Sequence, residues 1–255
     1  MLRPTLTIAR YTLLEALRNR LLWLLLLAAL GAVGLSGFLN ALALTESRQV
    51  QAALLAALLR LAAVFLTATF VVTSMVREAN DKGLEMLLAL PMPRAAYLLG
   101  KLAGYAALAL LPALMFGALT LPFATPAQAA LWSVSLLCEL WIVAAFGVLC
   151  ALSFSQALPA LAGTAGFYLL ARVVGSLQLL GQQHGGSAPL AQRGIAAGLD
   201  LIAAALPALD QFTRTDWLLY QGGDAAALLG VLLQTAIYLA LLTAAALFDL
   251  YRKSL

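Results

Sequence analysis

The stretch LLWLLLLAALGAVGLSGF, residues 21–38, decides the class of fold to which this chain belongs. It contains no charged residue, and its length is close to the roughly 20 apolar residues that a helix needs to cross a bilayer core. Strands of a membrane β-barrel alternate apolar and polar residues over about ten positions, whereas the leucine run in residues 21–30 does not alternate. Because a helix satisfies its own backbone hydrogen bonds in lipid, we expect an all-α fold.

The composition extends this membrane signal to the whole chain. Of the 255 residues, 64% are hydrophobic and 10% are charged, and the mean hydropathy is +0.97. A soluble domain carries roughly 25% charged residues. The net charge of +4 comes from basic residues scattered at the ends of apolar runs, so it does not predict a nucleic-acid partner. We therefore expect a polytopic membrane protein with one domain, residues 1–255, surrounded by a lipid bilayer.

Six apolar runs predict six transmembrane helices, at residues 21–38, 54–76, 102–121, 129–149, 158–180 and 225–248. Residues 1–20 mix leucines with four arginines, which is typical of an elbow helix that lies in the membrane interface. Residues 181–224 form the outer connection before the last span. Their apolar part, residues 195–209, is short and interrupted by Gly198, Asp200 and Pro207, so we expect an outer re-entrant hairpin rather than a seventh span.

The distribution of Lys and Arg predicts the orientation of the spans, because cytoplasmic connections carry an excess of both. With the N-terminus inside, the outer side holds only Arg48, Arg193 and Arg214. The cytoplasmic side holds ten basic residues: Arg3, Arg10, Arg18, Arg20, Arg77, Lys82, Arg94, Lys101, Arg252 and Lys253. We expect a multi-pass protein of a bacterial inner membrane with both termini in the cytoplasm.

The longest polar stretch on the cytoplasmic side is residues 77–101, REANDKGLEMLLALPMPRAAYLLGK. Leu84, Leu87 and Leu88 share one helical face, between the helix breakers Gly83 and Pro91. A helix of two turns is not stable alone in water, so its leucine face should be buried against another part of this protein or a partner. The alternative is a loop that only links two spans.

The same stretch resembles the coupling segment of the permease subunits of type 2 ABC exporters. The matching residues are Glu78, Gly83, Glu85, Leu87, Leu88, Pro91, Arg94, Gly100 and Lys101. Leu84 departs from the family, in which a threonine often follows the glycine. The elbow helix, the six spans, the outer hairpin and the basic C-terminus resemble the family as well, so the likeness covers nearly the whole chain.

The resemblance implies a non-catalytic permease that couples ATP hydrolysis in a separate subunit to export or to the motion of an outer accessory protein. Two ATPase subunits would bind ATP and Mg²⁺, and a second permease, identical or different, would complete the unit. The chain itself has no G-x-x-x-x-G-K-[ST] phosphate loop, because Gly100-Lys101 is followed by Leu102. We expect no cofactor, no metal and no catalytic residue in this chain.

Three ionisable residues fall within the expected spans, namely Arg60, Glu139 and Arg172. Each costs about 2.5–3.5 kcal/mol at the centre of a membrane helix, so each needs a function or a partner. Glu139 could line a substrate path or bind a cation; alternatively, it pairs with Arg172 or Arg60 and holds helices together. The alternative function is an ion-coupled secondary carrier that uses Glu139 and Arg172.

The glycines of the first span allow two interpretations. Gly31, Gly34 and Gly37 would let a neighbouring helix pack closely. Gly34-Leu35-Ser36-Gly37 also resembles the G-x-S-G of rhomboid-type intramembrane proteases, in which the serine is a nucleophile. The sole histidine of the chain, His184, falls in the outer connection rather than on a buried helix. We therefore favour helix packing, and we do not expect His184 to be a metal ligand.

Overall fold

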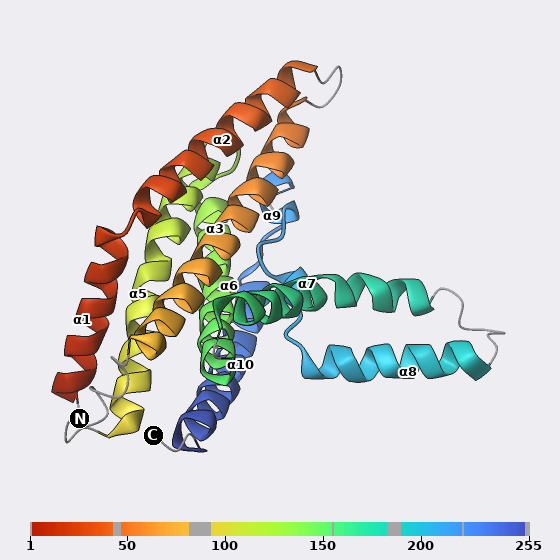
Figure 1. Cartoon of the computed structure of the whole chain (residues 1–255). Helices are drawn as coiled ribbons and strands as arrows, with labels where there is room; N and C mark the ends of the chain where they lie inside the picture. Colours follow the sequence, from red (N-terminus) through yellow and green to blue (C-terminus); the bar gives the residue numbers. More distant parts are fainter. Residues whose placement is uncertain are drawn as a thin grey trace.

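A computed structural model of the chain describes residues 2–42, 47–81, 93–154, 156–182, 190–220 and 222–252. Every regular element in these ranges is a helix (Figure 1). The longer helices are α1 (Leu2–Arg18), α2 (Leu21–Leu42), α3 (Ser47–Asn80), α5 (Arg94–Thr120), α6 (Pro126–Ser153), α7 (Ala157–Gln182), α8 (Leu190–Ala205) and α10 (Ala225–Arg252). Two short elements, η1 (Leu209–Gln211) and α9 (Asp216–Leu219), lie between α8 and α10.

Six of the described helices, α2, α3, α5, α6, α7 and α10, are long and apolar enough to cross a membrane. The expected all-α fold is therefore confirmed, and the apolar helices are those of a membrane-embedded protein. Both chain termini lie at the same end of the molecule (Figure 1), which is called the N/C end below. Arg94 at the start of α5 donates a hydrogen bond to the carbonyl of Leu250 near the end of α10, at 3.2 Å.

Helix α6 forms the centre of the fold. It packs against α3, α5, α7, α9 and α10. In α6, 72% of the 18-residue apolar segment is buried inside the protein, whereas in α10 only 17% of the corresponding segment is buried. Its first turn is set by Thr125, which caps the helix by accepting a hydrogen bond from the Gln128 amide at 3.4 Å, and by Pro126 at the first helical position. These five helices therefore surround α6, and α7 and α10 leave most of their own apolar segments unburied.

Two helices begin earlier than the apolar runs predict. Helix α3 begins at Ser47 and α5 at Arg94, whereas the expected spans began at residues 54 and 102. Helix α3 continues to Asn80, so residues 77–80 and 94–101 of the expected cytoplasmic segment are helical turns of α3 and α5. A hydropathy pattern ends where polar residues begin, but a helix continues through polar residues that find partners, as the buried Lys101 does.

Helix α1 packs along α5, and this is the most extensive helix pairing of the chain. The approach is close because Gly100 and Gly104 of α5 lack side chains. A Cβ at Gly100 would lie 2.8 Å from the Cβ of Ile8, and one at Gly104 would lie 2.7 Å from the Cβ of Thr12. The expected packing role of Gly31, Gly34 and Gly37 is wrong within this chain, since nothing lies within 4 Å of a Cβ built at any of them.

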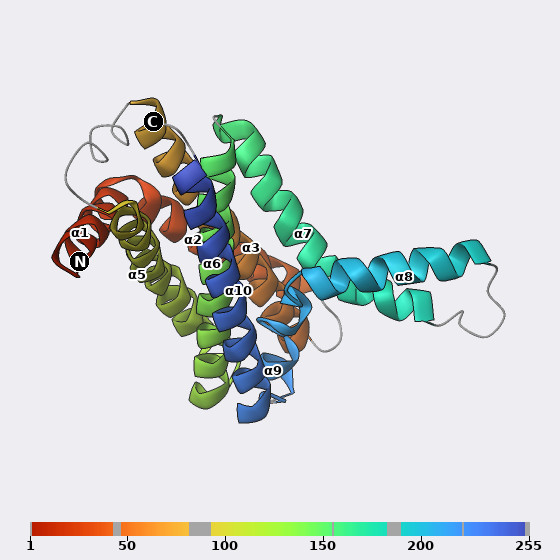
Figure 2. The same ribbon diagram turned by 90° about the horizontal axis from the view of Figure 1, so that it is seen from below.

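Helix α7 begins against α3 and α6, and its C-terminal part lies beside α8 and projects sideways with it from the other helices (Figures 1 and 2). The chain runs outward along α7 and back along α8. Gly198 and Asp200, which interrupt the apolar run in the sequence, both lie within the continuous helix α8. Asp200 accepts a hydrogen bond from the amide of Gln178 on α7 at 2.9 Å, so its polar side chain is used in pairing the two helices.

Candidate functional site

The expected coupling residues lie around the connection between α3 and α5. Glu78 is in the last turn of α3, and Arg94 is the first residue of α5. The remaining members of the set lie outside the described residues: Gly83, Leu84, Glu85, Leu87, Leu88 and Pro91. The short leucine-faced helix therefore stays a prediction, whereas the helix ends on both sides of it are described.

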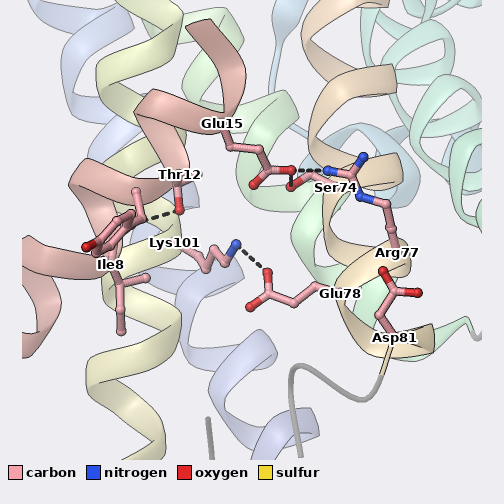
Figure 3. Close-up of a pocket in the computed structure, with 9 residues that line it drawn as sticks. Ile8, Thr12, Glu15, Ser74, Arg77, Glu78, Asp81 and Lys101 are labelled. Atoms are coloured by element: carbon pink, nitrogen blue, oxygen red, sulfur yellow. Dashed lines mark hydrogen bonds and ion pairs between the residues drawn. The ribbon is translucent and has the colours of Figure 1, made fainter. Parts of the chain in front are cut away.

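A cleft opens at the N/C end where these two helix ends meet α1 (Figure 3). Its volume is about 460 Å³. The lining residues come from α1, α3, α5 and the turn after α3: Ile8, Tyr11, Thr12, Glu15, Ser74, Arg77, Glu78, Asp81 and Lys101. Most of these side chains are polar or charged, and the chain leaves the cleft at Asp81 to enter residues 82–92. The cleft thus lies at the base of the expected coupling segment.

Lys101 and Glu78 form an ion pair that joins α5 to α3 in this cleft (Figure 3). The Lys101 side chain is 6% exposed and that of Glu78 is 18% exposed. A charge this deeply buried is tolerated only when it is paired. The sequence places the Gly100-Lys101 dipeptide at the opening of a span, whereas the structure places Lys101 two turns into α5.

Glu15 is a site residue that the sequence interpretation missed. From α1 it accepts hydrogen bonds from Arg77 and, at 3.0 Å, from the hydroxyl of Ser74, both on α3 (Figure 3). The Ser74 hydroxyl in turn accepts one from the buried Tyr105 hydroxyl of α5 at 3.3 Å. The sequence offered one signal. Glu15 is the only carboxylate in the otherwise basic helix Leu2–Arg18, and an acidic residue in such a helix indicates a contact with a basic or polar side chain.

A second polar cluster surrounds Glu139, which is fully buried on α6. Its Oε1 accepts a hydrogen bond from the Tyr168 hydroxyl at 3.0 Å and lies 3.4 Å from Nη1 of Arg172, both on α7. Its Oε2 accepts one from the Thr213 hydroxyl at 2.7 Å. The structure thus joins two of the three expected intramembrane residues, Glu139 and Arg172, in one ion pair.

Arg172 also holds the turn between η1 and α9 against the spans. Its Nη1 faces the carbonyl of Leu209, the carbonyl of Phe212 at 2.9 Å and the hydroxyl of Thr213 at 3.4 Å. The amide of Thr213 donates to the Ser135 hydroxyl on α6 at 2.9 Å. Thr213 has φ 45°, a left-handed conformation that is strained for a β-branched residue. These contacts stabilise it.

Arg60, the third expected residue, contacts this turn rather than Glu139. Its Nη1 donates to the Thr213 carbonyl at 3.5 Å, and the side chain is half-buried. Both carboxylate oxygens of Glu139 are already occupied by donors, so the geometry favours the expected structural ion pair over an open substrate path. The cluster fixes the chain after η1 to three spans, α3, α6 and α7.

The nucleophilic serine and the metal ligand that were considered and disfavoured from the sequence gain no support from the described residues. The Ser36 hydroxyl donates to the Val33 carbonyl of its own helix at 3.0 Å, and His184 lies outside the described residues. In the described part of the chain, no three His, Cys, Asp or Glu residues are placed to hold a metal ion. Cys138 and Cys150 are both free and buried.

The fold and these two clusters describe an all-helical, membrane-embedded protein with ion pairs between its long apolar helices and at its N/C end. A scan of the sequence against protein-family models gave no match. A search of curated proteins gave no match either. Assignment to a family therefore depends on the residues of the chain itself.

Proposed function

We propose that this chain is the permease subunit of an ATP-binding-cassette exporter of type 2, with ATP hydrolysed by a separate subunit. The observation that carries the proposal is the cleft of α1, α3 and α5, because its ion pairs bracket the connection that resembles a coupling segment. Force applied to residues 82–92 would reach α3 directly through Asp81 and α5 through Arg94. No group in the chain needs to react for this to occur.

The proposed arrangement in the membrane follows the sequence expectations. Six spans cross a bacterial inner membrane, α1 lies in the cytoplasmic interface, and the N/C end faces the cytoplasm. Helix α7 is the fifth span, and α8 and the turn at Thr213 belong to the outer re-entrant region. Two such chains, or this chain and a related one, would enclose the path, and two ATPases would bind at the N/C ends.

The decisive experiment is copurification with the ABC ATPase encoded beside the chain, followed by ATP turnover in lipid nanodiscs. Glu85→Arg combined with Leu88→Asp should remove a charge and an apolar anchor from the expected interface. Loss of anchors of this kind costs about 2 kcal/mol or more, or at least about 30-fold in affinity. The ATPase should therefore no longer copurify.

The matched control is Asp216→Arg, which makes the same kind of charge change on an exposed side chain of α9, in the proposed outer region. This variant should retain the ATPase and its turnover. Retention of the ATPase by the Glu85→Arg, Leu88→Asp variant would show that the coupling assignment is wrong. Failure of the unsubstituted chain to bind any ATPase would remove the proposed function itself.

An ion-coupled carrier is the second candidate, and the full burial of Glu139 beside Arg172 is the observation that favours it. A carrier of this kind needs Glu139 to change partners during transport. If the chain is such a carrier, Glu139→Gln should abolish transport, and the transport rate of the unsubstituted chain should not depend on ATP. In the exporter, transport depends on ATP, and ATP turnover should persist in Glu139→Gln if the complex assembles.

A further inference from the structure

We infer that α1 belongs to the moving part of the exporter, with Glu15 and Lys101 as positioning residues that hold α1, the end of α3 and the start of α5 together as one rigid unit. This inference rests on the proposed function, because it concerns how force on residues 82–92 is passed on. An interfacial helix that only anchored the chain to lipid would need none of the contacts described below.

The first argument is steric. The α1–α5 contact is built on Gly100 and Gly104, one turn apart on the same face of α5. At both positions even a methyl group would collide with α1, at 2.8 Å from Ile8 and 2.7 Å from Thr12. Packing with no space for a methyl group does not allow the two helices to slide, because interiors at this density shift as units.

The second argument is the polar network across the cleft. Glu15 of α1 holds two side chains of α3, Ser74 and Arg77, and Ser74 is held in turn by Tyr105 of α5. Three helices therefore meet at one serine hydroxyl. Ser74 and Arg77 both donate to Oε1 of Glu15, so separating α1 from the end of α3 would break both hydrogen bonds at once.

The third argument is the ion pair of Lys101 and Glu78. It lies in the same cleft and joins α5 to the last turn of α3, one residue beyond Arg77. Both side chains are largely buried, so removal of either partner would leave the other charge without its counter-ion and largely shielded from water. The two ends of the coupling connection are thus tied to each other and to α1 before the connection begins.

The inference is tested by distances between spin labels in the complex of the full chain with its ATPase, in lipid nanodiscs. The background carries alanine at Cys138 and Cys150. Labels at Arg10→Cys and Asn80→Cys report α1 against α3, and Arg10→Cys with Leu99→Cys reports α1 against α5. Arg10→Cys with Phe154→Cys reports α1 against the end of α6. All four labelled side chains are exposed.

The expected result is that the first two distance distributions are the same without nucleotide and with trapped ATP, whereas the third shifts. Glu15→Gln with Lys101→Met should make the α1–α3 distribution depend on nucleotide while the ATPase still copurifies. In a chain with native Glu15, exchange of the charges by Glu78→Lys with Lys101→Glu re-forms the ion pair in reverse. The α1–α3 distance should then again be independent of nucleotide. Asp216→Asn, which removes an exposed ion pair on α9, should change none of the three.

Two outcomes would overturn the inference, and they differ in meaning. A nucleotide-dependent α1–α3 or α1–α5 distance in the unsubstituted complex, together with a shift in the α1–α6 distance, would refute the rigid unit and leave the proposed exporter standing. If none of the three distances responds to ATP although the ATPase is bound, α1 does not belong to a moving part, and the inference fails together with the proposed transfer of force from residues 82–92.

Discussion

Glu139 is the residue with the most demanding environment in the described part of the chain. It is fully buried in the helix that is itself most buried, and it is charged. Three donors from two other regions of the chain, Tyr168, Arg172 and Thr213, satisfy it. Sequence alone showed that a carboxylate in an apolar helix needs a partner. It left open whether that partner was Arg172 or Arg60.

Glu139→Gln should destabilise the protein strongly. The substitution keeps the size of the side chain and removes its charge, so Arg172 loses its counter-ion inside the bundle. Breaking a buried pair in this way costs about 3 kcal/mol or more in free energy of unfolding. Denaturant titration in mixed micelles measures that loss.

The control for this prediction is Asp216→Asn, which makes the same carboxylate-to-amide change in the exposed pair with Arg214, at 3.3 Å. Surface pairs contribute about 0–1 kcal/mol, so its unfolding should be nearly unchanged. Equal stability of Glu139→Gln and Asp216→Asn would contradict the placement of Glu139 in a buried pair.

At the scale of elements, glycines on two helices have different surroundings although the sequence pattern treats them alike. Gly100 and Gly104 of α5 meet α1 directly, whereas Gly31 of α2 meets nothing within 4 Å. The spacing of small residues indicates that a helix can be approached closely. It does not indicate which helix approaches, because that depends on how the chain returns after several spans.

Gly104→Ala and Gly31→Ala therefore form a matched pair of substitutions. The methyl group at position 104 would lie 2.7 Å from Thr12, and overpacking of this kind costs about 1–3 kcal/mol. At position 31 alanine has open space and should stabilise the helix by about 0.5–1 kcal/mol. Thermal unfolding of the two purified variants measures the difference, and a Gly104→Ala protein as stable as Gly31→Ala would refute the α1–α5 packing.

At the scale of the whole molecule, charged side chains gather at the N/C end of the bundle. The N/C end collects Arg77, Arg94 and Lys101 beside Glu15 and Glu78. These basic residues were among the ten that predicted the cytoplasmic side. The structure brings them together at one end. This placement could be inferred from the sequence, because successive spans would cross the membrane in opposite directions. The sequence could not show that Arg77 and Lys101 pair with carboxylates and that Arg94 donates to the Leu250 carbonyl.

Labelling of single cysteines tests the proposed orientation. In a background with alanine at Cys138 and Cys150, Asp216→Cys should react with a membrane-impermeant maleimide in cells whose outer membrane has been opened. Arg252→Cys should react only after the inner membrane is permeabilised, since both side chains are exposed and only the side of the membrane differs. The reverse pattern would show that the N/C end faces outward.

The sequence by itself determined that the chain is helical and membrane-embedded, because long apolar runs such as residues 21–38 can be satisfied in lipid only as helices. It also identified Glu139 and Arg172 as residues that need a partner. The tertiary structure alone decided that they pair with each other, that Glu15 and Lys101 tie three helix ends together, and that α1 packs on Gly100 and Gly104. The physical reason is that burial cost is a property of a single residue, whereas a partner is supplied by whichever distant segment packs beside it.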